Sequence, residues 1–213
     1  AGNDSFLLDR ADAYIGVLID DLVTLGTTEP YRMFTSRAEY RLQLRADNAD
    51  QRLTRKGIDA DCVGGERRQA FLKKAKALDD GRSLLKRLTA TPTWIGRRGI
   101  AVSQDGVRRS AAEMLSHAGI DIDTLAAVWT ELGTIEADVA RQLQIEARYA
   151  AYLDRQEADI RAFRRDESLE LPAELDFSAI TGLSAEAMEK LTRARPATLG
   201  AASRISGVTP AAL

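Results

Sequence analysis

The spacing of apolar residues predicts a mainly α-helical chain with one long spine helix. Residues 134–167 contain no glycine or proline, and Ile135, Val139, Leu143 and Ala147 recur at intervals of four residues. Charged residues fill many of the positions between them, which is the pattern of an amphipathic helix. At 1.5 Å per residue such a helix spans roughly 50 Å, and we expect it to form the spine of the fold.

A second strongly amphipathic helix is predicted over residues 66–88. Phe71, Ala75 and Leu78 mark its apolar face, and lysines occupy the positions between them. We interpret these lysines as a solvated face rather than a binding site. Gly81 is a poor helix former and leaves open a break within the helix.

The first sixty residues give a more mixed pattern. A helix is favoured over residues 12–23, although residues 14–19 would also suit a buried strand. Residues 24–30 are predicted to form a loop. For residues 31–45 the pattern leaves open a short β element or a helix laid on the core. A short helix is expected from about residues 47 or 48 to Gly57, because Asp and Asn are good N-caps and glycine often ends a helix.

The middle of the chain is predicted to change from long to short helices. Residues 89–106, which contain Pro92 and three glycines, are expected to be the least regular part and to separate two helical layers. Short helices follow over residues 110–118 and 123–129. We interpret Trp94 and Trp129 as core or inter-helix residues rather than as base-stacking groups.

A small terminal helical bundle is predicted at the end of the chain. Its helices cover residues 184–195 and 198–206, and Gly207 is a plausible C-cap. With these elements the chain divides into three expected parts. Residues 1–60 form a linking segment, residues 61–170 a helical domain, and residues 171–213 a small C-terminal helical subdomain.

Composition narrows the class of protein without naming it. The 213 residues carry a formal net charge of −2, so any attraction to nucleic acid has to be local. With Cys62 as the single cysteine, an intramolecular disulfide is impossible. We expect a cytoplasmic protein without a membrane segment. The chain lacks an initiator methionine and ends on a helix start at Thr209 and Pro210, so we also expect it to be a fragment.

The motifs of an autonomous enzyme are missing from the sequence. It contains neither a GxGxxG dinucleotide fingerprint nor a P-loop, and His117 is its only histidine. A cofactor site within these 213 residues is therefore not predicted, and neither is a metal site or a catalytic residue.

Residues 29–54 combine arginines with aromatic residues, and we call them the signature run. Together with Arg55 and Lys56 they hold seven cations against four carboxylates, with Tyr31, Phe34 and Tyr40 among them. Two interpretations stay open. The arginines pair with carboxylates on a solvated face, or they bind phosphates while the rings stack on bases of a folded RNA.

The order of residues in this run closely resembles the MnmG (also called GidA) family, the flavoprotein subunit of the bacterial tRNA wobble-uridine modification enzyme. The matching letters are EPYRMFTSRAEYRL at 29–42 and DNADQRLT at 47–54. Further blocks match the family in the same order: RADAYIGVLIDDLVT at 10–24, QIE at 144–146, YAAYLDRQ at 149–156, ITGLS at 180–184, RPATLG at 195–200 and ASRISGVTPAA at 202–212.

This resemblance implies that the chain is the C-terminal part of a longer FAD-dependent enzyme. With its GTPase partner MnmE, such an enzyme modifies carbon 5 of the tRNA wobble uridine, using NADH and methylenetetrahydrofolate, and it acts as a homodimer. The flavin site and the catalytic cysteines belong to the family's N-terminal domain, and Cys62 matches none of them. The isolated C-terminal part is expected to be inactive.

The sequence predicts two sets of contact residues. The candidates for RNA binding are the cations of the signature run and the two that follow it: Arg32, Arg37, Arg41, Arg45, Arg52, Arg55 and Lys56. The candidates for contact with the GTPase are the arginines of the terminal bundle: Arg193, Arg195 and Arg204. The alternative is a module for protein–protein contact without RNA, in which the signature run packs against the flavin domain.

Overall fold

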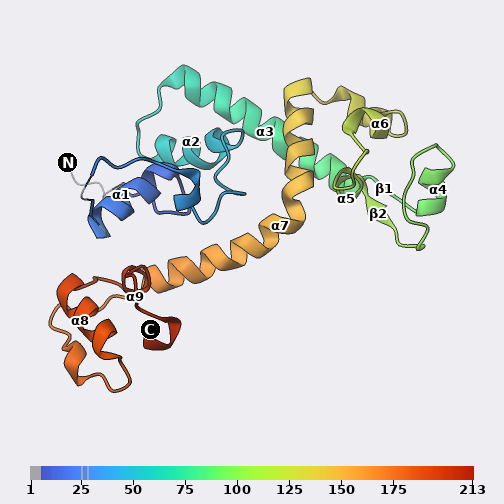
Figure 1. Ribbon diagram of the computed structural model, residues 1–213. Helices are drawn as coiled ribbons and strands as arrows, with labels where there is room; N and C mark the ends of the chain where they lie inside the picture. The colour runs from blue at the N-terminus through green and yellow to red at the C-terminus, as the bar shows by residue number, and fades with distance from the viewer. Residues whose placement is uncertain (1–5, 25, 28) are drawn as a thin grey trace. The chain divides into compact units, whose positions relative to one another are not determined.

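The computed structural model describes residues 6–24, 26, 27 and 29–213, and this part of the chain is mainly helical (Figure 1). The α-helices are α1 (Tyr14–Thr24), α2 (Ala49–Asp59), α3 (Gly65–Arg87), α4 (Pro92–Gly96), α5 (Ala111–Leu115), α6 (Ile122–Ala126), α7 (Ala137–Glu167), α8 (Ala185–Ala194) and α9 (Leu199–Ser203). Short 3₁₀ turns are η1 (Thr35–Arg37), η2 (Thr130–Thr134), η3 (Phe177–Ala179) and η4 (Pro210–Ala212). The prediction of a mainly α-helical protein is confirmed.

The contacts divide the chain into two compact units. Unit 1 holds the residues up to Leu44 together with Arg155–Leu213, and unit 2 holds Arg45–Asp154. The boundary falls inside α7, the predicted spine helix, which begins three residues later than expected and ends at Glu167 as expected. The three-part division at residues 60 and 170 stays a prediction.

Unit 2 is organised around one apolar core. Its buried members include Leu78, Ile95, Leu115, Leu132 and Leu143, which come from α3, α4, α5, η2 and α7. The helix α3 continues through Gly81, so the break left open by the sequence does not occur. A Cβ on Gly81 would lie 2.6 Å from Cδ1 of Leu143. The glycine therefore allows a close contact with α7 instead of interrupting α3.

The segment 89–106 is more ordered than the sequence predicted. Strands β1 (Thr89–Ala90) and β2 (Arg109–Ser110) pair antiparallel, with Thr89 opposite Ser110, and close a loop that contains α4. The Thr91 side chain accepts a hydrogen bond from the amide of Trp94 and caps α4. Trp94 and Trp129 stack with their ring centroids 5.8 Å apart. Among the described residues, these two strands form the one β-sheet.

The helix α2 continues two residues beyond Gly57, its predicted end. It ends instead in a Schellman turn, in which Asp61 takes a positive φ of 54° and the amide of Cys62 donates to the Gly57 carbonyl at 2.9 Å. Gly57 is buried, and a Cβ there would lie 3.0 Å from the Val63 side chain. The glycine serves packing at this position and does not end the helix.

Unit 1 contains two small apolar clusters. One consists of Val17, Ala38 and Leu44, and the other consists of Phe177, Leu191 and Ala202. The terminal bundle has its helices α8 and α9 where the sequence predicted them, and Ser184 and Thr198 cap them through their side chains. Gly207 has a positive φ of 93°, but it lies beyond the end of α9, whose C-cap is Arg204.

Residues 31–45 form neither the β element nor the longer helix that the sequence left open. They contain the 3₁₀ turn η1 and a turn at residues 41–43. The backbone here is satisfied by local turns and by two distant side chains instead of a neighbouring strand. Arg10 donates to the Arg37 carbonyl at 3.1 Å, and the amide of Gln43 donates to the Gln156 side chain at 2.9 Å. These partners remove the need for a β ladder.

Gly16 on α1 meets the chain segment that precedes the helix at very close range. A Cβ built on Gly16 would lie 2.1 Å from the carbonyl oxygen of Asp9, a backbone atom that cannot turn aside. We therefore expect Gly16→Ala to lower the free energy of unfolding by about 1–3 kcal/mol, the range for overpacking a filled site.

Thermal unfolding followed by circular dichroism measures this change. The control is Gly65→Ala at the start of α3, where a Cβ meets no atom within 4 Å. We expect the control to unfold at or above the temperature of the parent, because alanine is the better helix former. A Gly16→Ala protein as stable as the Gly65→Ala protein would contradict the close approach.

Candidate nucleic-acid interface

An open hollow in unit 1 is lined by the beginning of the signature run and by the loop before it. Its volume is about 370 Å³. The lining residues are Gly26, Thr27, Glu29, Pro30, Tyr31, Arg32, Phe34 and Arg37. The sequence-predicted residues Arg32 and Arg37 are thus brought together with two of the three aromatic residues of the run.

Each of these arginines lies over one ring. The Arg32 guanidinium carbon is 4.9 Å from the centroid of Phe34, and that of Arg37 is 4.5 Å from the centroid of Tyr31. Phe34 is 48% exposed and the Arg37 side chain is 40% exposed. Flat cationic and aromatic surfaces that remain accessible are the groups that bind phosphates and stack on unpaired bases.

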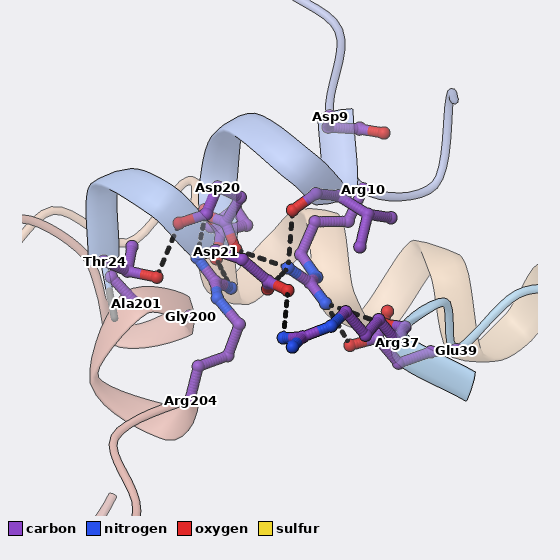
Figure 2. Close-up of polar contacts among 12 residues, drawn as sticks. Asp9, Arg10, Asp20, Asp21, Thr24, Arg37, Glu39, Gly200, Ala201 and Arg204 are labelled. Atoms are coloured by element: carbon purple, nitrogen blue, oxygen red, sulfur yellow. Dashed lines mark hydrogen bonds and ion pairs between the residues drawn. The ribbon is translucent and has the colours of Figure 1, made fainter. Parts of the chain in front are cut away.

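The hollow is supported by a buried charge network that begins at Arg10. Arg10 is 5% exposed, and Figure 2 shows carboxylates converging on its guanidinium. Its Nη1 lies 2.6 Å from Asp21 and 2.8 Å from Asp20, and its Nη2 lies 2.7 Å from Glu39. Burial alone lowers the pKa of Arg10, but the hydrogen bonds to Glu39 and Asp21 outweigh burial and raise it. Arg10 therefore stays charged inside the unit.

Asp21 connects this network to the hollow. Its Oδ2 accepts a hydrogen bond from the Tyr31 hydroxyl at 2.7 Å and lies 3.5 Å from Nη1 of Arg37. Burial favours a higher pKa for Asp21, but the hydrogen bonds from Tyr31 and Arg10 lower it below its ordinary value. Burial and the bond to Asp21 raise the pKa of Tyr31. One carboxylate thus orients both members of the Arg37–Tyr31 pair.

The network also reaches the terminal bundle through Arg204. Its Nη2 lies 2.9 Å from Asp20, and its Nη1 pairs with Glu167 at the end of α7. The Arg204 side chain is only 16% exposed, so the projection expected of it is not seen. Arg193 and Arg195 are exposed, and Arg195 donates to the Ala173 carbonyl at 3.0 Å.

The remaining sequence-predicted cations are not part of the hollow. Arg41 is exposed in unit 1 outside the lining, and the other four belong to unit 2. The four are Arg45, Arg52, Arg55 and Lys56. The signature run is therefore divided between the two units, with the boundary between Leu44 and Arg45.

In unit 2, Arg45 is held by internal contacts. Its side chain is 12% exposed, its Nε lies 2.9 Å from Asp47, and its guanidinium lies 4.6 Å from the centroid of Tyr149. The hydrogen bond from Arg45 lowers the pKa of Asp47. Arg52 donates to Asn48 at 2.9 Å and to the Arg45 carbonyl. Arg55 is exposed, and Lys56 is half-buried.

Sequence reasoning found Arg32 and Arg37 but missed the network beneath them. Arg10, Asp20 and Asp21 all lie within the block at residues 10–24, so the signal was present in the sequence. The block combines one arginine with two adjacent carboxylates, and any of them that is buried requires a partner of opposite charge. Which residue supplies it depends on how the chain folds back.

We expect Asp21→Asn to destabilise the protein at neutral pH by on the order of 3 kcal/mol, because it leaves the buried Arg10 guanidinium without one carboxylate. The pKa of Asp21 is lower in the folded state, so its contribution is complete above the unfolded pKa of about 3.9 and is lost as the pH falls through the folded pKa. The variant should therefore lose less stability than the parent below about pH 4.

Urea unfolding between pH 2 and pH 7 measures both effects. The control is Asp159→Asn on the part of α7 in unit 1, an exposed aspartate with no salt bridge to another described residue. Its curve should follow that of the parent within about 0.5 kcal/mol. Parallel pH profiles for the parent and Asp21→Asn would show that the network does not carry the charge-dependent stability.

Comparison with known proteins gives two family matches along the chain. Residues 65–157 match the tRNA modifying enzyme MnmG/GidA C-terminal helical domain. Residues 159–213 match the MnmG/GidA C-terminal helical bundle.

Curated relatives match over nearly the whole chain. The tRNA uridine 5-carboxymethylaminomethyl modification enzyme MnmG of Granulibacter bethesdensis is 48% identical over 212 residues, which cover all of this chain and 34% of the relative. The enzyme of the same name from Latilactobacillus sakei is 42% identical over 99% of this chain. The chain spans about a third of the length of these relatives.

Solved structures agree with these matches. Aquifex aeolicus GidA in its form II crystal superposes with a TM-score of 0.74 at 33% identity, covering 96% of this chain and 32% of that one. The form I crystal gives a TM-score of 0.70. The chain therefore belongs to the MnmG/GidA family of tRNA-modifying enzymes and corresponds to its C-terminal helical region.

Proposed function

We propose that this chain is the tRNA-docking and partner-binding part of an enzyme that modifies carbon 5 of the tRNA wobble uridine. The observation that carries the proposal is the hollow with its two exposed guanidinium–aromatic pairs, Arg32 with Phe34 and Arg37 with Tyr31. The relatives are named for the modification of tRNA uridine. A surface that binds phosphates and stacks on bases suits a folded RNA.

The two arginines of the hollow contribute to tRNA binding in different ways, one by orientation and the other by charge. Arg37 is partly neutralised by Asp21, so its planar group supplies orientation more than net charge. Arg32 is exposed, as is Arg41 nearby in the sequence, and these two supply positive charge. Arg55 and Lys56 serve as outer phosphate contacts from unit 2. Arg45 and Arg52 then act mainly by holding the local structure, because their guanidinium groups bind neighbouring groups of the chain.

The flavin chemistry belongs to another part of the longer enzyme. The named strands among the described residues are two residues long, and neither leads into a glycine-rich turn that would hold a dinucleotide. The described residues thus do not fit FAD. We propose that FAD, NADH and methylenetetrahydrofolate are used by the part of the enzyme that precedes the matched region in the relatives.

The terminal bundle is proposed to contact the GTPase MnmE through Arg193 and Arg195, which are exposed at the end of α8. Arg195 adopts a left-handed conformation with φ 45°, and its bond to Ala173 fixes its direction. Arg204 supports this surface from within, since it holds α9 against the end of α7. The whole enzyme is proposed to be a cytoplasmic homodimer. Among the described residues, no helix is long and apolar enough to cross a membrane.

A second candidate function is contact with another protein domain without RNA. The observation that favours it is an apolar stripe on α1, where Ile15, Ile19 and Val23 are 48%, 53% and 78% exposed. These residues recur at four-residue spacing on one side of the helix. Such a face suits packing against the flavin domain, and in this alternative the chain makes no direct RNA contact.

Replacing both hollow arginines should weaken tRNA binding. We expect Arg32→Gln with Arg37→Gln to raise the Kd for tRNA at least tenfold. The slope of log affinity against log salt should fall by roughly 0.7–0.9, the contribution of one phosphate contact, because Arg37 supplies little net charge. Filter binding at several salt concentrations measures both quantities.

The matched control is Arg161→Gln with Arg165→Gln, two cations of α7 that are 70% and 72% exposed in the same unit. It removes the same charge away from the hollow, so its Kd should change less than threefold. Unchanged tRNA binding by the hollow variant, with circular dichroism intact, would remove the RNA assignment and favour the second candidate.

Charge reversal at the end of α8 tests the partner surface. We expect Arg193→Glu with Arg195→Gln to reduce capture of the GTPase at least fivefold, because both exposed cations of this helix end are lost. Pull-down with purified GTPase measures capture, and tRNA affinity serves as the internal control. Full capture by this variant would exclude the α8 arginines as the contact.

A further inference from the structure

Residues 86–110 form a strongly positive segment outside the signature run. It holds six cations (Lys86, Arg87, Arg97, Arg98, Arg108 and Arg109) against one carboxylate, Asp105, which is a surplus of five positive charges. The signature run with Arg55 and Lys56 has seven cations against four carboxylates, a surplus of three. This concentration is unexpected in a chain of net charge −2.

The segment is held as a defined loop of unit 2. Figure 1 shows α4 in a loop that leaves and returns through β1 and β2. Pro92 and Ile95 anchor α4 in the core. The Gln104 side chain donates to the Pro92 carbonyl at 3.3 Å and ties the returning arm to α4. The cations on both arms therefore belong to one loop whose arms are tied together.

In this loop the guanidinium of Arg98 stacks on the ring of Trp94. The Arg98 guanidinium carbon lies 3.6 Å from the centroid of Trp94, and its Nη1 donates to the Trp94 carbonyl at 3.1 Å. Trp94 stacks in turn on Trp129, which is 9% exposed, while Trp94 itself remains 37% exposed. Trp129 is a core residue, as the sequence predicted. Trp94 packs against it but keeps an exposed part.

Five of the six cations are exposed, and three of these lie in the loop between β1 and β2. Arg97, Arg98 and Arg108 are exposed, whereas Arg109 pairs with Asp105. Glu113 is occupied as well, because it accepts hydrogen bonds from the amide and hydroxyl of Ser110. A fixed planar guanidinium with two exposed arginines in the same loop supplies a stacking face and donors for phosphates.

We infer that the loop of residues 91–108 is a second RNA-binding surface, which takes a single-stranded stretch or loop of RNA on the Arg98–Trp94 stack with Arg97 and Arg108 on the phosphates. The inference rests on the proposed function, since it adds a second contact for the same tRNA. RNA fits better than an acidic peptide, because a stacked guanidinium plane recognises bases as well as charge.

The test uses tryptophan fluorescence, because the chain has two tryptophans. In a Trp129→Phe protein, Trp94 is the only source of tryptophan emission. We expect oligouridylate of about twelve nucleotides to change this emission saturably. Arg97→Gln with Arg108→Gln should raise the midpoint at least tenfold while leaving the Arg98–Trp94 stack intact. Arg98→Lys keeps the charge but loses the plane, and it should raise the midpoint about fivefold.

The charge-matched control is Arg67→Gln with Arg68→Gln, two exposed cations at the start of α3 in the same unit. It should shift the midpoint less than threefold. If the control raises the midpoint as much as Arg97→Gln with Arg108→Gln, or if Arg98→Lys leaves the midpoint unchanged, binding is general electrostatic attraction. Either result would overturn the inference. A response to polyglutamate but not to oligouridylate would also overturn it, in favour of an acidic protein partner.

The same reporter separates this inference from the proposed function. If Arg32→Gln with Arg37→Gln abolishes tRNA binding while Trp94 never responds to RNA, the second surface fails and the hollow stands. If Trp94 responds to RNA while the hollow variant binds tRNA normally, the hollow fails and the second surface stands.

Discussion

The charge of Arg10 is the constraint on which unit 1 depends. A buried guanidinium costs several kcal/mol unless carboxylates and carbonyls surround it. Here Asp20 and Asp21 from α1 and Glu39 from the segment after η1 supply the carboxylates, and the Arg37 carbonyl accepts a further bond. Segments far apart in the sequence have to converge on this one group. The positions of Tyr31 and Arg37 at the hollow follow from that convergence, because Asp21 binds both of them.

This arrangement separates two tasks that arginines perform in the same few residues. Arg10 and Arg204 are enclosed and spend their donors on internal carboxylates, so they hold the chain together. Arg32 and Arg41 are exposed and keep their charge available to an external anion. Arg37 belongs to both groups, since one face meets Asp21 and Tyr31 while the side chain stays 40% exposed. A count of arginines in the signature run cannot distinguish these tasks, and burial can.

Much of the fold could be predicted from the sequence because its helices have clear periodicity. The long helix over residues 137–167 and the caps at Ser184 and Thr198 are local features. Glycine was misread at two positions, since Gly57 and Gly81 serve close packing and end no helix. The conformation of residues 31–45 could not be predicted, because local turns combine there with bonds from Arg10 and Gln156 in distant parts of the chain. The candidate site followed the same division. The composition of the run indicated Arg32 and Arg37, but the pairing of Arg10, Asp20 and Asp21 beneath them depends on how the chain folds back.

The near-neutral net charge conceals an uneven distribution, and this determines how such a protein meets RNA. Residues 29–56 and 86–110 carry surpluses of three and five positive charges, so the other 160 residues carry a surplus of ten negative charges within the total of −2. Under the proposed function an RNA is attracted to these two segments, whereas residues 111–213, with a surplus of seven negative charges, repel it. Repulsion outside the contact surfaces suppresses nonspecific binding and restricts the orientation of approach. A uniformly basic protein would bind phosphate more strongly, but it would give up this control over where a tRNA is held.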